Sequence, residues 1–164
     1  LSEEHLRVDE IMGRANRRTK QDMRPGMFIA LLYAVLDAKN KSMIICSAGQ
    51  TQPIYFSSTS GETKLVETKG DKFPLGILDE SKYEETRISL SPGDKAVFYT
   101  DGIVEAMNEK GEMFGFDRFL EIVQKENASS ADVLLHKILE EVKEFSGNAV
   151  QHDDITIISV SVEP

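Results

Sequence analysis

The stretch that decides the fold runs from residue 95 to residue 102 and reads Lys-Ala-Val-Phe-Tyr-Thr-Asp-Gly. Its mostly apolar first part, 95–99, is typical of a buried strand, which then ends at Asp101 and Gly102. Scaffolds hold functional groups most firmly where a strand begins or ends, so Asp101 is a candidate functional residue. Gly102 permits tight backbone geometry and the close approach of a ligand or metal. The alternative interpretation of Asp101 is a plain Asx turn.

A second acidic turn, His152-Asp153-Asp154-Ile155-Thr156, precedes the last apolar run. Adjacent carboxylates repel each other, and a cation would offset that repulsion. Together with Asp101, Asp153 and Asp154 would supply oxygen ligands suited to Mg²⁺ or Mn²⁺. His152 could contact a bound phosphate. The alternative is a polar loop that leads into the last strand.

Outward from these turns, hydrophobic periodicity predicts three helices and a larger number of short strands. The predicted helices are 3–22, capped by Ser2, then 116–125 and 131–145. The predicted strands are 27–36, which we expect to be buried and central, 42–47, 54–56, 63–66, 86–90, 95–99 and 154–162. Because tight turns join most of the strands, the predicted class is α+β, with antiparallel sheets and helices on the sheet faces.

Composition limits the function classes. The 164 residues carry a net charge of −9, which argues against nucleic acid or an anionic membrane as the main partner. No apolar run approaches the ~20 residues of a membrane span, so we expect no membrane contact. The single cysteine, Cys46, lies in an apolar run and is expected in the core, which fits a reducing, cytoplasmic location.

Several common motifs are absent from the sequence. There is no Gly-x-Ser-x-Gly elbow for acyl-enzyme chemistry and no Gly-x-x-x-x-Gly-Lys-Ser/Thr phosphate loop. The charged first residues do not form a signal peptide. Because the sequence opens on a helical pattern without an initiator Met, we expect it to be part of a longer protein.

Six stretches resemble, in the same order, motifs of the stage II sporulation protein E branch of the PPM (phosphatase 2C-like) superfamily of bacterial metal-dependent protein phosphatases. They are 26–37, 47–53, 74–77, 90–106, 112–115 and 153–156. The most telling are Tyr99-Thr100-Asp101-Gly102 and Asp153-Asp154-Ile155-Thr156. Each motif is weak alone, but six in order are specific, and they cover nearly the whole chain.

The resemblance implies an α/β/β/α sandwich of antiparallel sheets, with residues 1–164 as a single, partial domain. It implies hydrolysis of phosphoserine or phosphothreonine on a protein by a water that two Mn²⁺ or Mg²⁺ ions activate. Matched by motif, Asp101 and Asp153 would be metal ligands at the catalytic centre. Asp154 would tune the site or join it when a further ion binds. The implied partner is a phosphorylated regulatory protein of the anti-anti-sigma type.

The chain departs from the family pattern in two places. It lacks the family's first acidic motifs, "GGDyyD" and "GDVsGhG", and Gln50 replaces the usual His of the "GH" turn. We therefore expect this chain alone to be weakly active or inactive, with exposed core surface that favours a homodimer. The helix at 3–22 would correspond to, or neighbour, the family's regulated switch helix. The alternative function is a catalytically incompetent module that binds a sigma-factor regulator.

Overall fold

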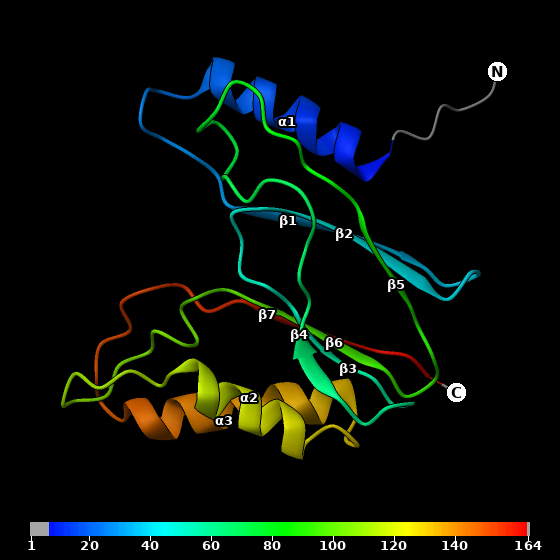
Figure 1. Cartoon of the computed structure of the whole chain (residues 1–164). Helices are drawn as coiled ribbons and strands as arrows, with labels where there is room; N and C mark the ends of the chain where they lie inside the picture. Colours follow the sequence, from blue (N-terminus) through cyan, green and yellow to red (C-terminus); the bar gives the residue numbers. More distant parts are fainter. Residues whose placement is uncertain (1–6, 164) are drawn as a thin grey trace. The chain divides into compact units, whose positions relative to one another are not determined.

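The computed structural model describes residues 7–163, which belong to two compact units. The first unit contains the chain up to Gln50 together with Glu67–Leu90, and the second contains Thr51–Val66 and the chain from Ser91 onwards. Each unit has one antiparallel sheet with helical segments packed on it (Figure 1). The predicted α+β class with antiparallel sheets is therefore confirmed.

The first unit is a three-stranded sheet with one helix. Its elements in chain order are α1 (Val8–Asp22), β1 (Leu31–Asp37), β2 (Ser42–Ala48) and β5 (Thr86–Ser89). The strand order is β1-β2-β5, and the first two strands form an antiparallel hairpin. Val8 and Met12 of α1 pack on Cys46 and Ala48 of β2. Burial raises the pKa of the Cys46 thiol to about 11, so this thiol is an inert core group.

Helix α1 begins at Val8, and the predicted positions 3–6, with Ser2 and His5, lie outside the described residues. The Val8 N–H donates to the carboxylate of Glu85 at 2.9 Å, which satisfies one of the free amides of the first turn. Further along, buried Asn16 donates to the carbonyl of Leu78 and accepts from the N–H of Gly76. Asn16 thereby fixes the loop of residues 74–78 against the helix.

The prediction of a buried central strand at 27–36 is wrong. Strand β1 begins only at Leu31, and it is an edge strand that pairs with β2 alone. Most of its side chains are exposed, and so are Met27, Phe28 and Ile29 before it. The apolar run suggested a central, buried position, but within its own unit β1 has a partner strand on one side only.

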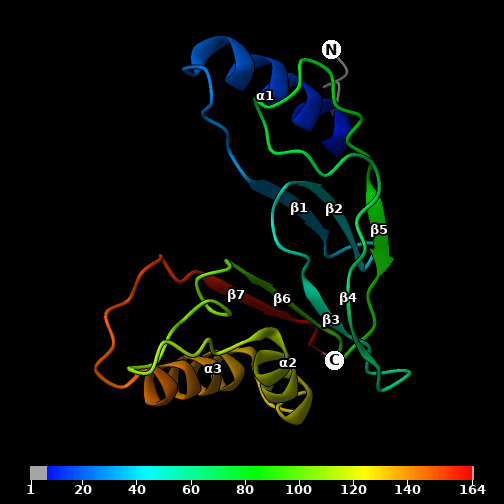
Figure 2. The same ribbon diagram turned by 60° about the vertical axis from the view of Figure 1, so that its left-hand side comes forward.

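The second unit is a four-stranded sheet with two helices. Its elements are β3 (Ile54–Phe56), β4 (Thr63–Leu65), β6 (Lys95–Tyr99), α2 (Phe116–Lys125), α3 (Ala131–Ser146) and β7 (Ile157–Ser161). The strand order is β4-β3-β6-β7. Helices α2 and α3 lie side by side along one face of this sheet (Figure 2). Their apolar faces enclose the larger core of the protein, which includes Val97, Phe119, Leu134 and Ile138.

Strand β6 is the central element of that unit, hydrogen-bonded to β3 on one side and β7 on the other. Tyr99 at its end packs edge-to-face on Phe119, with 4.7 Å between the ring centroids. Asp94, just before the strand, is buried and accepts hydrogen bonds from the Tyr55 hydroxyl, the Ser91 N–H and Ser58. Burial alone would raise the pKa of Asp94, but these hydrogen bonds outweigh it and hold the pKa below its usual range.

Candidate metal centre

Three carboxylates meet at one end of the second unit's sheet. Ligand oxygens of Asp101, Glu105 and Asp153 all lie within 4.8 Å of one another, and all three residues are exposed. Asp101 and Glu105 come from the turn after β6, and Asp153 comes from the loop before β7. The two acidic turns that stand out in the sequence are thus neighbours in space.

Asp101 and Glu105 are joined by one helical turn. The Glu105 N–H donates to the Asp101 carbonyl at 2.9 Å, the bond of a single α-turn. Residues four apart in such a turn present their side chains on the same side. Sequence reasoning missed Glu105 as a site residue, although its spacing from Asp101 in Asp101-Gly-Ile-Val-Glu105 was a signal that could have indicated it.

Thr100 fastens the two acidic loops together. Its hydroxyl donates to the Asp154 carbonyl at 2.9 Å and accepts from the Thr156 N–H at 2.9 Å. Its own N–H donates to the Thr156 carbonyl at 3.0 Å, which extends the β6–β7 pairing by one step. These three hydrogen bonds of Thr100, which we call the clasp, place Asp101 and Asp153 beside each other.

Gly102 has a steric role in the same contact. A Cβ atom at this position would lie 2.5 Å from the Asp154 carbonyl oxygen and 3.0 Å from its carbonyl carbon. The sequence predicted that Gly102 allows the close approach of a ligand or metal. In the structure the group that approaches is the backbone of Asp154, and any larger residue would push the two loops apart.

Asp154 contributes to this arrangement through its main chain. Its N–H donates to the side chain of Asp153 at 2.7 Å, and its carbonyl accepts from Thr100. Its carboxylate is not in the three-residue cluster found among the described residues. The role of Asp154 as a metal ligand therefore stays a prediction, as do the ligand roles of Asp101 and Asp153.

The chemistry of the cluster fits a hard divalent cation. Within residues 7–163, no ion pair to a basic side chain involves Asp101, Glu105 or Asp153. Three converging carboxylates without a basic partner repel one another, and a cation relieves that repulsion. Carboxylate oxygens are the ligands that Mg²⁺ and Mn²⁺ take, and three of them supply about half of an octahedral shell.

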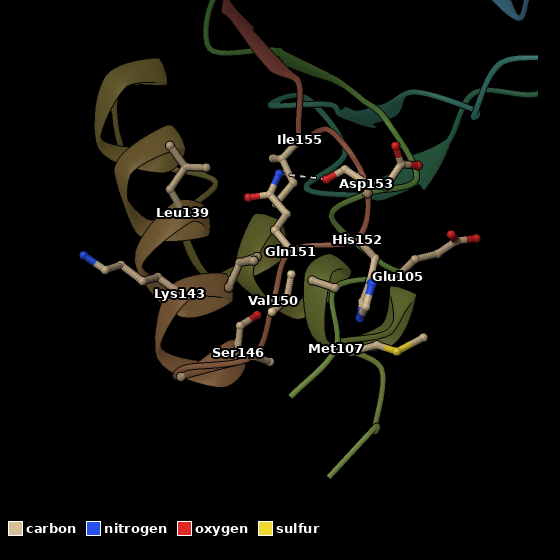
Figure 3. Close-up of a pocket in the computed structure, with 15 residues that line it drawn as sticks. Glu105, Met107, Leu139, Lys143, Ser146, Val150, Gln151, His152, Asp153 and Ile155 are labelled. Carbon is tan, nitrogen blue, oxygen red and sulfur yellow. Dashed lines mark hydrogen bonds between the residues drawn. The ribbon is translucent and has the colours of Figure 1, made fainter. Parts of the chain in front are cut away.

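A cavity of about 430 Å³ adjoins the cluster. The cluster residues Glu105 and Asp153 line one side of it together with Gly102, and most of the rest comes from α3 and the loop after it (Figure 3). The Gln151 side-chain amide donates to the Asp153 carbonyl at 2.7 Å and so supports the acidic loop from within the cavity. His152 also lines this cavity and is exposed, next to Asp153.

Solved structures of PP2C-like phosphatase domains share this fold. The SiaA PP2C domain of Pseudomonas aeruginosa superposes with a TM-score of 0.78 at 21% identity, over 94% of this chain and 61% of that one. The Mn-presoaked phosphatase domain of SpoIIE from Bacillus subtilis gives 0.66 at 15% identity, over 98% and 69%. These likenesses concern the fold.

The family is shown by sequence. The model of the stage II sporulation protein E (SpoIIE) family matches residues 1–163, and the chain belongs to this family. The phosphoserine phosphatase RsbU of Bacillus subtilis is 26% identical over 158 residues, which are 96% of this chain and 46% of RsbU. The chain spans less than half the length of the curated relatives that it matches. None of the described helices has the length and apolar character needed to span a membrane.

Proposed function

We propose that this chain forms part of a metal-dependent phosphoprotein phosphatase that hydrolyses phosphoserine or phosphothreonine on a regulatory protein. The observation that carries the proposal is the convergence of Asp101, Glu105 and Asp153 from two loops that Thr100 joins. Membership of the SpoIIE family and the similarity to a phosphoserine phosphatase support it.

The three carboxylates would hold the cation, either Mn²⁺ or Mg²⁺. A divalent cation bound there supplies positive charge that lowers the pKa of a water molecule and neutralises phosphoryl oxygens. The hydrogen bonds of Thr100 and the close backbone contact at Gly102 hold the two loops together, so Asp101 and Asp153 lie beside each other before the site fills. Asp154 would tune the site from the neighbouring position.

The proposed substrate is a phosphorylated regulator of the anti-anti-sigma type, encountered in the cytoplasm. The family resemblance suggests this partner, and the acidic net charge of −9 disfavours nucleic acid as a substrate. The relatives named above are phosphatases, which favours catalysis over the alternative of a non-catalytic binding module.

Isothermal titration calorimetry with Mn²⁺ tests the cation site directly. Glu105→Gln is expected to weaken Mn²⁺ binding at least about tenfold, since even outer-shell partners of a metal site are worth that much. Glu109→Gln is the matched control, because Glu109 is also exposed, four residues further along, and lies outside the cluster. Equal affinities in both variants would refute the assigned ligand set.

Mn²⁺-dependent hydrolysis of para-nitrophenyl phosphate tests the reaction. Activity that depends on Mn²⁺ and is lost in Asp101→Asn is the expected result in a form extended towards the length of its relatives, while this chain alone is expected to be weakly active or inactive. A chain that binds Mn²⁺, stays folded and still hydrolyses nothing, here and in a form extended towards the length of its relatives, would favour the non-catalytic binding module instead.

A further inference from the structure

The cavity beside the carboxylate cluster has an apolar lining that metal binding does not require. Helix α3 contributes Leu139 and Val142, the loop after it contributes Val150 and Ile155, and Met107 adds to the lining from the turn after Glu105. Val142 is buried at the base, whereas Leu139 and Val150 are 44% and 76% exposed. Covering exposed apolar side chains of a concave site with an apolar group is favourable, because it removes apolar surface from water.

The cavity is continuous with the candidate metal centre. Glu105 and Asp153 belong both to the cluster and to the cavity wall, so a phosphoryl group held at the carboxylates would have this cavity as its immediate neighbour. In Figure 3 the carboxylate side chains of Glu105 and Asp153 lie at one side and Leu139 of α3 lies at the other. A group attached next to a phosphate at the carboxylates would therefore reach the cavity.

The remaining lining indicates a peptide rather than a purely apolar ligand. The Ser146 hydroxyl and the His152 ring line the same cavity and supply hydrogen-bonding groups beside the apolar surface. Lys143 lies at the edge and extends away from the carboxylates, so its charge does not neutralise them (Figure 3). An apolar base with a few polar groups suits an apolar side chain flanked by peptide bonds.

We propose that this cavity is a specificity subsite that takes an apolar side chain next to the phosphoserine of the protein substrate. The proposal rests on the proposed function, since it assumes a phosphoprotein at the carboxylates. The volume of about 430 Å³ is in the range of ligand sites and accommodates a leucine side chain. Burying such a side chain is worth about a tenfold gain in affinity or more.

Fluorescence anisotropy with two labelled peptides in the presence of Mn²⁺ tests the subsite. Both peptides carry the phosphonate isostere of phosphoserine, which is not hydrolysed, and it is flanked by leucine in one peptide and by serine in the other. The leucine peptide is expected to bind about tenfold more tightly. Equal binding of the two peptides, or no binding of either, would overturn the proposal.

Variants locate the preference in the cavity. Leu139→Asp and Val150→Asp should each abolish the leucine preference, while Val133→Asp should retain it, because Val133 is 50% exposed on the same helix but does not line the cavity. Val150 lies in a loop and is the most exposed of the three, so its substitution leaves the core intact. A preference that survives in both cavity variants would refute the subsite.

Hydrolysis of para-nitrophenyl phosphate by the same unsubstituted sample separates the two proposals. A leucine preference that depends on Leu139 and Val150, in a chain that shows no hydrolytic activity either alone or in a form extended towards the length of its relatives, would uphold the subsite and reject the proposed reaction. Mn²⁺-dependent hydrolysis without any leucine preference would uphold the reaction and reject the subsite.

Discussion

Strands β1 and β6 are similarly apolar in sequence but differ in burial. Leu-Leu-Tyr-Ala-Val-Leu in β1 is at least as apolar as Ala-Val-Phe-Tyr in β6. Nevertheless β6 is buried between two partner strands under α2 and α3, whereas β1 is a largely exposed edge. The comparison teaches that an apolar run indicates a strand, while the neighbours of that strand decide whether it is buried.

The largest difference between the two strands is expected at the aspartates that flank them. Asp94→Ala should lower the free energy of unfolding by roughly 3 kcal/mol, because the buried Tyr55 hydroxyl and the part-buried N–H groups of Ser58 and Ser91 lose an ionised acceptor. Asp37→Ala at the end of β1 should cost far less than Asp94→Ala, since its hydrogen bonds to Asn40 are exposed to water. Urea unfolding followed by circular dichroism measures both, and it suits a chain without tryptophan.

Acid should weaken the stabilisation that Asp94 provides next to β6. The folded-state pKa of Asp94 is lowered, so its ionised form is the stabilising one. The contribution is fully present above the unfolded pKa of ~3.9. It is lost as the pH falls through the lower folded-state pKa. Unfolding free energies measured from pH 5 downwards should therefore fall less steeply in Asp94→Asn than in the unsubstituted chain, and parallel curves would contradict this account.

The next largest effect is expected at Gly102. Gly102→Ala should cost about 2.5 kcal/mol, towards the upper end for overpacking, because the atom that the new Cβ meets belongs to the backbone. The same variant should weaken Mn²⁺ binding, as the two acidic loops move apart. Gly13→Ala in α1 is the control: its Cβ meets only the end of a flexible arginine, so the change should stabilise the helix slightly. Unchanged Mn²⁺ affinity in Gly102→Ala would argue against the steric role.

Two valines test the comparison within the strands themselves. Val97→Ala in β6 should destabilise by about 2 kcal/mol, because it removes two buried methyl groups and leaves a cavity. Val35→Ala in β1 should change the free energy of unfolding by less than about 0.5 kcal/mol, which is usual for an exposed site. Val97 is 1% exposed and Val35 36%. Similar losses in the two variants would show that β1 is covered in solution, as in the expected homodimer.

The smallest expected effect is a gain in stability at Ser159. The Ser159 hydroxyl of β7 is buried beside Val97, and no hydrogen-bond partner for it is found among residues 7–163. Ser159→Ala removes this unsatisfied group and should stabilise the protein by about 0.5–1 kcal/mol. Thermal unfolding would show the gain as a higher midpoint. A lower midpoint would show that the hydroxyl is hydrogen-bonded to water.

Local signals predicted the elements around the site well. Strand β6 and helix α2 have the predicted bounds, because turn residues or a change of periodicity mark each of their ends. The burial of β1 could not be predicted, since it depends on which strands pair beside it. Asp101 and Asp153 stood out as candidates by their positions at strand ends. Glu105 needed the single α-turn to bring it back to Asp101, and the cavity needed the packing of α3 beside the loop before β7.

The hydrogen bonds of Thr100 determine at which stage of its synthesis the chain can form the carboxylate cluster. Asp101 and Glu105 leave the ribosome long before Asp153, and the hydrogen bonds that bring these residues together all end on residues 154–156. A nascent chain that has folded its first hairpins still holds two carboxylates without the third. The cluster is complete only when the last strand docks beside β6, so metal loading would report on a finished sheet.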